Sequence, residues 1–242
     1  MDSAANAVQT NTGFSAMSAD KHGVSLRHAW LVWGCAAVFY LYEYALRASP
    51  SVMTHELMAD FGLTSTTFGV LASFYYYSYV ALQVPCGIIV DRLGPRRVIT
   101  FSAILCILGS YLFAESYTLF SAQMGRFLLG AGSACAYLSC AKIGAEWFPA
   151  PKFALIASVT MMMGTFGGIV GTLPTALLMN AYGWRLAMVI MAVIGIAVAA
   201  ASWLIIRDRP SGSENTNNYA LAKQKGLLGD LKDIVGNPQI WL

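Results

Sequence analysis

The sequence predicts an all-α protein that crosses a membrane several times. Hydrophobic residues make up 57% of its 242 residues and charged residues only 11%, whereas about 25% charged residues is usual in a soluble domain. Five stretches are apolar over most of a span and a sixth carries charges within it. Each is close to the roughly 20 residues that cross the hydrocarbon core of a bilayer. We therefore expect a bundle of six transmembrane helices.

Each predicted helix is an apolar run that ends at turn-forming or charged residues. Pro50 closes the first run, and Ser51–Thr66 follows it as a polar loop. Charged turns lie at 91–97 and 148–152, and Tyr182–Arg185 forms the turn before the last run. The expected helices cover residues 28–49, 67–90, 98–114, 119–147, 153–180 and 186–206.

Positive charges select one orientation of these helices. Eleven Lys and Arg residues fall in the segments on one side, against Arg185 alone on the other. The positive-inside rule therefore predicts a multi-pass protein of the cell membrane with a cytoplasmic N-terminus. Residues 1–27 are expected to be a disordered cytoplasmic tail, not a cleaved signal peptide. Residues 207–242 are expected to be a cytoplasmic linker, with an amphipathic helix at 223–236 and the first turn of a seventh helix at its end.

The sequence argues against an enzyme or a metal protein. It contains no Gly-x-Ser-x-Gly and no His-Glu-x-x-His, and its three histidines lie at or outside the predicted membrane ends. The cysteines form no Cys-x-x-Cys pair, so we expect small buried apolar residues and neither a disulfide framework nor a zinc site. No cofactor, metal or nucleic acid is expected. The cysteines are Cys35, Cys86, Cys106, Cys135 and Cys140.

One charged turn carries a family resemblance. The segment Gly-Ile-Ile-Val-Asp-Arg-Leu-Gly-Pro-Arg-Arg at 87–97 resembles the signature loop between helices 2 and 3 of the major facilitator superfamily, although Pro95 departs from the usual pattern. Arg126-x-x-x-Gly130-x-Gly132 and Gly183-Trp184-Arg185 resemble two further motifs of that family. In the family, the loop motif latches two halves of a transporter together. The residues to which that role carries over are Gly87, Asp91, Arg92, Gly94, Arg96 and Arg97.

The resemblance implies the N-terminal half of a secondary transporter. Its fold would be two inverted three-helix repeats, with the chain ending before a second half of six helices. A missing C-terminal half or a second copy would then be needed to complete the site. A small-residue face for close packing is expected on the fifth helix, at Gly164, Gly167, Gly168 and Gly171.

Ionisable residues inside a membrane are costly, and by default they are candidates for function. Four are predicted here: Glu43, Arg47, Arg126 and Lys142. Glu43 and Arg47 share one helix face with Tyr40 and Tyr44, because they follow a spacing of three and four residues. The resemblance implies that helices 1 and 4 line a central cavity, which places this face against substrate.

Depth along the helices distinguishes these residues. Arg47 and Arg126 lie about 10 and 12 Å from the midpoints of their helices, at similar height. Two guanidinium groups in one cavity would clamp a carboxylate or phosphate. Alternatively, Arg126 bonds backbone carbonyls and Arg47 reaches the outer interface. Glu43 is the candidate proton carrier. Lys142 is a second-tier cavity candidate, because it lies about 160° around the helix from Arg126.

The charges within the predicted helices and the resemblance together predict a transporter for a small anionic or zwitterionic metabolite, working by alternating access in a lipid bilayer, with protons as the candidate coupling ion. Its branch resembles either organic-anion and organophosphate carriers or dipeptide-type carriers. The alternative is a non-transporting membrane protein that keeps the half-fold, as a sensor, an assembly partner or an inert fragment.

Overall fold

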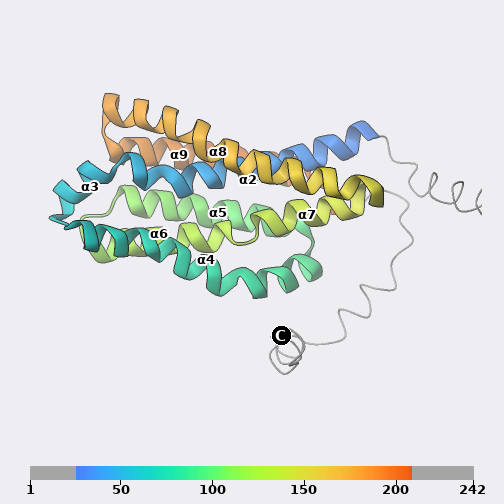
Figure 1. Cartoon of the computed structure of the whole chain (residues 1–242), viewed down its shortest axis with the longest axis horizontal. Coiled ribbons are helices and arrows are strands. Elements are labelled where there is room, and N and C mark those ends of the chain that lie inside the picture. Colours follow the sequence, from blue (N-terminus) through green and yellow to red (C-terminus); the bar gives the residue numbers. More distant parts are fainter. Residues whose placement is uncertain (1–25, 209–242) are drawn as a thin grey trace, which may run out of the picture.

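The computed structural model describes residues 26–208, which form one bundle of helices (Figure 1). The predicted tail, apart from its last two residues, and the predicted linker beyond Asp208 lie outside the described residues, as do the amphipathic and seventh helices expected there. Within the described part there are no strands. The elements are α2 Leu26–Val52, α3 Thr54–Phe61, α4 Ser65–Leu93, α5 Pro95–Ala114, α6 Leu119–Ser133, α7 Ala136–Trp147, a 3-10 turn at Ala150–Lys152, α8 Phe153–Tyr182 and α9 Trp184–Ile205.

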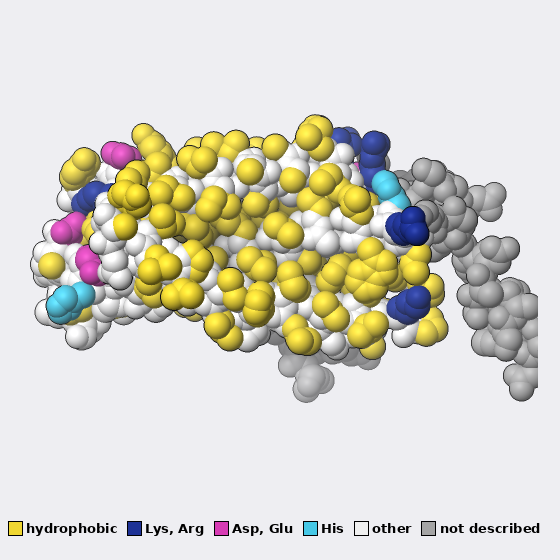
Figure 2. Space-filling model, turned by 90° about the horizontal axis from the view of Figure 1, so that it is seen from above, with side chains coloured by type: hydrophobic (Ala, Val, Ile, Leu, Met, Phe, Trp, Pro, Cys, Tyr) yellow, Lys and Arg dark blue, Asp and Glu magenta, His cyan; other side chains and the backbone are white. Residues whose placement is uncertain are grey.

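Within residues 26–208, five helical segments are long and apolar enough to cross a membrane: Leu26–Val52, Pro95–Ala114, Leu119–Trp147, Ala150–Tyr182 and Trp184–Ile205. Helix α4 has 29 residues and packs against α6, but it is not one of these five. Apolar side chains cover the side of the bundle, and charged side chains gather at its two ends (Figure 2). The predicted all-α, polytopic membrane fold is confirmed.

The bundle is held by a few dominant helix pairs. Helix α5 packs against α6 and α9, α2 packs against α8, and α4 packs against α6. The spans Leu26–Val52 and Leu119–Trp147 are the most buried of the five, and Glu43 and Arg126 lie within the core. The outer helices α8 and α9 leave much of their apolar surface exposed, as expected where lipid or another membrane segment covers it.

The first helix is longer than its sequence predicts. We expected Pro50 to end it, but α2 continues through Pro50 to Val52. The predicted polar loop is also partly helical, because α3 forms within it. A proline near the end of a helix leaves only the carbonyl four residues earlier without its N–H partner. Here that carbonyl belongs to Leu46, and the Ser49 hydroxyl donates to it at 2.8 Å.

The predicted fourth helix is broken in two. Helix α6 ends at Ser133 and α7 begins at Ala136, and the break places Cys135 beside Cys86 of α4. The two cysteines form a disulfide with a Cα–Cα distance of 5.3 Å, within the usual range. The expectation that the cysteines form no disulfide was therefore wrong for this pair. Their separation of 49 residues carries no signal of pairing, since the packing of α4 against α6 and α7 brings them together.

The disulfide predicts how many thiols react. Three of the five cysteines, Cys35, Cys106 and Cys140, are free. We expect a maleimide reagent to label three thiols in the unreduced, denatured chain and five after reduction. Intact-mass spectrometry measures both numbers, and five labels without reduction would contradict the pairing.

Candidate anion-binding site

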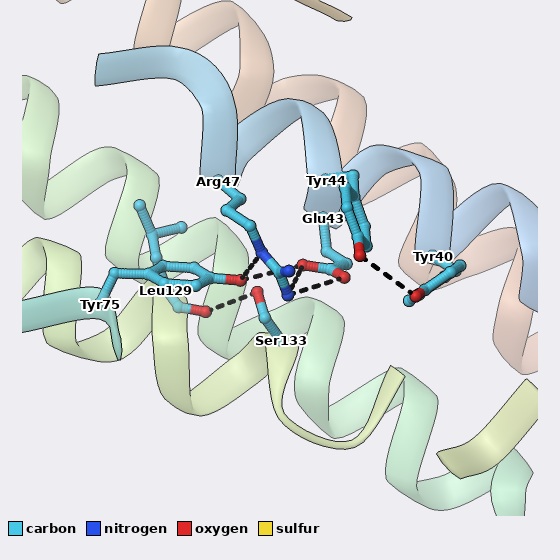
Figure 3. Close-up of polar contacts among 7 residues, drawn as sticks. All are labelled: Tyr40, Glu43, Tyr44, Arg47, Tyr75, Leu129 and Ser133. Atoms are coloured by element: carbon cyan, nitrogen blue, oxygen red, sulfur yellow. Dashed lines mark hydrogen bonds and ion pairs between the residues drawn. The ribbon is translucent and has the colours of Figure 1, made fainter. Parts of the chain in front are cut away.

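The predicted pair on α2 forms and gains a partner from α4. Arg47 Nη2 lies 3.4 Å from Glu43 Oε1, one helical turn away. Arg47 Nε donates a hydrogen bond of 3.0 Å to the Tyr75 hydroxyl, and that hydroxyl donates one of 3.0 Å to Glu43 Oε2 (Figure 3). The Glu43 side chain is 0% exposed, so its charge depends on these partners. The three residues thus form a closed polar triangle between two helices.

The two tyrosines predicted on the same face lie beside this triangle. The Tyr44 ring lies 4.3 Å from the Arg47 guanidinium carbon, in the position of a cation–π contact. The Tyr40 hydroxyl meets that of Tyr44 at 3.5 Å. Helix α8 comes close here because Gly164 has no side chain, and an added Cβ would lie 2.6 Å from the Tyr40 ring. The tyrosines therefore pack against α8 and present their hydroxyls toward the bundle.

The glycines predicted for close packing on α8 face α2. A Cβ on Gly167 would lie 2.6 Å from the Leu41 carbonyl oxygen, and one on Gly171 would overlap Ala45. Gly168 is less tightly packed, since its Cβ would meet the Tyr44 ring at 3.8 Å.

Arg126 lies in the core, on α6. Its side chain is among the largest buried ones, and the residue is 1% exposed. Its Nη1 donates to the Leu46 carbonyl at 3.3 Å, which is the carbonyl that Pro50 leaves without an N–H partner. Its guanidinium carbon lies 4.9 Å from the centre of the Tyr75 ring. Within residues 26–208 it makes no ion pair, and its Nε has no hydrogen-bond partner. It is a buried cation without a counter-ion in this part of the chain.

Arg47 and Arg126 line the same cavity. Its volume is about 330 Å³, and Tyr44 also contributes to its wall. Phe68 and Ala72 of α4 make much of the remainder apolar. A cavity of this size holds a small metabolite, and an apolar wall with a few polar groups is typical of such sites. Arg47 of α2 and Arg126 of α6 thus share one cavity, as the sequence predicts for two arginines at similar height. Tyr40 does not line this cavity.

Lys142 lies elsewhere. Its Nζ donates to Asp91 Oδ1 at 2.5 Å and lies 3.7 Å from Glu146 Oε1. It does not line the cavity of Arg47 and Arg126. Lys142 thus lies outside this cavity, and its role as a second-tier cavity residue stays a prediction. In the sequence, Lys142 and Arg126 belong to one predicted helix. In the structure, Lys142 lies on α7, after the break at Ala134–Cys135, and its side chain reaches the Asp91 carboxylate.

The loop motif at 87–97 joins α4, α5 and α9 at the end of the bundle away from the cavity. Gly94, with a φ of +81°, lets the chain turn sharply between α4 and α5. Asp208 accepts a hydrogen bond of 2.8 Å from the Arg96 N–H and fills the space where a Gly94 side chain would be. Arg96 also donates to the Trp203 carbonyl at 2.9 Å and stacks on its ring. The Asp91 side chain is 68% exposed despite its bond to Lys142.

The remaining motif residues differ in their surroundings. A Cβ added to Gly87 would meet nothing within 4 Å, so no close helix approach depends on this glycine among the described residues. Arg92 and Arg97 are exposed to different degrees at the same end as Arg96.

The sequence reading missed two elements of this architecture. Tyr75 was only one of several tyrosines on its helix, and no sequence signal separates it from Tyr76 or Tyr79. At the other end of the bundle, Arg185 Nη1 donates to the Ser116 carbonyl at 2.6 Å, and Trp184 Nε1 donates to Asp60 at 2.8 Å. The turn before α9 therefore bonds to the α5–α6 loop through Arg185 and to α3 through Trp184. Its Gly-Trp-Arg motif was the signal for these contacts.

Comparison with known proteins identifies the family. Residues 32–242 match the family model of the Major Facilitator Superfamily. The chain is 27% identical over 180 residues to the probable galactarate/D-glucarate transporter GarP of Escherichia coli K12, covering 70% of this chain and 39% of GarP. It is 26% identical over 247 residues to the membrane sensor protein UhpC of Salmonella typhimurium, covering 92% of this chain and 54% of UhpC.

A solved structure shows the same fold. A bacterial homologue of the human lysosomal transporter Spinster, in an inward-facing and unoccupied conformation, matches with a TM-score of 0.69 at 19% identity. The match covers 90% of this chain and 51% of that one. The chain thus spans about half the length of the proteins it matches. The family-model match over most of the sequence means that this chain belongs to the Major Facilitator Superfamily.

Proposed function

We propose that the chain forms the N-terminal anion-binding site of a secondary transporter, which moves a small organic acid across the cell membrane by alternating access. The observation that carries this proposal is Arg126. A buried guanidinium without a counter-ion is costly unless an anion compensates it, and Arg126 opens onto the cavity that Arg47 also lines. Two planar guanidiniums match the geometry of carboxylates.

The charges of Arg47, Arg126 and Glu43 favour a substrate with two negative charges. While Glu43 is ionised, it neutralises one of the two guanidiniums, so the site has one positive charge in excess. When Glu43 holds a proton, both guanidiniums are available to an anion. A dianion would therefore bind together with a proton on Glu43, which makes proton symport the coupling that fits the site. The name of GarP, a probable galactarate/D-glucarate transporter, supports a sugar dicarboxylate.

The rest of the transporter would complete this cavity. We expect residues of a second half, from a longer polypeptide or from a second copy, to close the site opposite Arg47. Asp91 is exposed at the end of the bundle that also carries Arg92, Arg96 and Arg97. This end would be cytoplasmic, and Asp91 would there latch onto a helix N-terminus of the second half.

Calorimetry with a matched pair of ligands tests this function. D-Gluconate is D-glucarate with one carboxylate replaced by a hydroxymethyl group. We expect the purified chain in nanodiscs at pH 6 to bind D-glucarate at least tenfold more tightly than D-gluconate, since about 1.4 kcal/mol of extra interaction is a factor of ten. Equal affinities, or no binding of either, would refute the dianion site.

A membrane sensor is the second candidate function. The match to UhpC covers more of this chain than the match to GarP does, and a sensor would bind the anion without moving it. Uptake of radiolabelled D-glucarate into proteoliposomes distinguishes the two. Uptake that depends on an inward proton gradient supports the transporter, whereas binding without uptake favours the sensor.

A further inference from the structure

Tyr75 contacts all three charged residues of the site, Arg47, Glu43 and Arg126. Its hydroxyl accepts from Arg47 Nε and donates to Glu43 Oε2, both at 3.0 Å (Figure 3). Its ring centre lies 4.9 Å from the Arg126 guanidinium carbon and 5.4 Å from that of Arg47. The residue is 0% exposed, so water does not compete for its hydroxyl.

The backbone holds Tyr75 in a fixed place. Helix α6 approaches α4 at Gly130, where an added Cβ would overlap the Tyr75 carbonyl oxygen. The Ser78 hydroxyl, on the next turn of α4, lies 2.7 Å from the Phe127 carbonyl oxygen and 3.0 Å from that of Tyr75, and its one proton is shared between them. The backbone of Tyr75 is therefore fixed by a contact between two helices, and the buried ring extends from it to the site.

We propose that Tyr75 is the positioning residue of the anion site, holding Arg47 against Glu43 when the cavity is empty and retaining Glu43 when a substrate anion draws Arg47 away. This inference rests on the proposed function. A phenol donates one proton and accepts another, so a single hydroxyl serves both the carboxylate and the guanidinium. Without it, Glu43 would be buried with no hydrogen-bond partner once Arg47 moves to the anion, and this is costly whether the carboxyl group is ionised or protonated.

The test compares two tyrosines one turn apart. Tyr79 stacks on Tyr75 at an interplanar angle of 15° and its ring lies 4.8 Å from Arg47, but its hydroxyl makes no hydrogen bond within residues 26–208. We expect Tyr75→Phe to weaken D-glucarate binding about tenfold, as is typical for losing a hydrogen bond to a charged group. Tyr79→Phe is expected to change it less than threefold. Calorimetry on the full chain in nanodiscs measures both.

A double-mutant cycle separates positioning from a structural role. If Tyr75 acts through Glu43, the effect of Tyr75→Phe should shrink to threefold or less in a Glu43→Gln background, whereas a purely structural role gives the same factor in both backgrounds. If Tyr75→Phe does not fold, Ser78→Ala replaces it, because it removes the hydroxyl that bonds the Tyr75 and Phe127 carbonyls and leaves no clash. Ser73→Ala, which removes an exposed hydrogen bond of α4, is the control, and Ser78→Ala should weaken binding about threefold relative to it.

The outcomes are distinct. If the wild-type chain binds no D-glucarate, the proposed function fails and this inference falls with it. If the wild type binds but Tyr75→Phe changes the affinity less than threefold, or by the same factor in both backgrounds, only the positioning role is overturned. After the replacement, equal affinities of Ser78→Ala and Ser73→Ala overturn it in the same way.

Discussion

Replacing Arg126 with glutamine is expected to weaken D-glucarate binding about 100-fold, because removing one partner of a buried charged contact costs roughly 2–5 kcal/mol. The same change is expected to stabilise the fold. Arg126 is buried without a counter-ion within the described residues, so the unloaded protein gains when the charge is removed. Each kcal/mol gained would raise the melting temperature by about 2–4 °C. Affinity lost together with stability gained is the signature of a binding residue.

Arg185→Gln is the matched control for that result. Arg185 lies in the first turn of α9, where it donates to the carbonyls of Ala114 and Ser116 and pairs with Asp60. It does not line the cavity. Its loss should lower the melting temperature and leave D-glucarate affinity unchanged. Calorimetry and differential scanning fluorimetry on the same samples measure both quantities. A lower melting temperature for Arg126→Gln with unchanged affinity would show that Arg126 is structural.

Replacing Glu43 with glutamine is expected to remove the pH dependence of D-glucarate binding. In the wild type, a dianion binds together with one proton, so affinity should rise as pH falls, by at most about tenfold per pH unit. D-Glucarate itself stays a dianion between about pH 5 and 8, because carboxyl groups titrate near pH 4. Glutamine fixes position 43 in a neutral form, so the variant should bind with the low-pH affinity throughout.

Other titratable groups near Glu43 do not mimic this behaviour. Among the described residues, the titratable groups that interact with its carboxylate are those of Arg47, Tyr40, Tyr75, Cys106 and Cys140. Ordinary guanidinium, phenol and thiol groups titrate above pH 8.

Glu115→Gln serves as the control, since Glu115 is an exposed residue at the end of α5. Calorimetry from pH 5.5 to about pH 8 measures the slopes, in the range where carboxylate ligands stay ionised. A Glu43→Gln variant that keeps the wild-type slope would exclude Glu43 as the proton site.

Much of the site could be predicted because membrane insertion makes charge informative. Glu43, Arg47 and Arg126 stand out in apolar runs, since a charge in hydrocarbon is too costly to keep without a purpose. Helical spacing then placed Glu43 and Arg47 on one face. Tyr75 could not be selected in the same way. A neutral tyrosine costs far less in a membrane helix than a charged residue does. The sequence therefore does not show which of the tyrosines on α4 contacts the charged pair.

The sequence by itself determined the all-α membrane fold, the family and the charged pair on the first helix, because each depends on local composition or on spacing within one helix. The tertiary structure decided which helices meet. It placed Tyr75 between Arg47 and Glu43, gave Arg126 the Leu46 carbonyl that Pro50 leaves vacant, and directed Lys142 to Asp91. It also joined Cys86 to Cys135 across a break in the fourth helix. The contacts of Tyr75 with Arg47 and Glu43 join residues 28 and 32 positions apart, and the others join residues 49 or more positions apart. All of them depend on close helix packing that no single helix encodes.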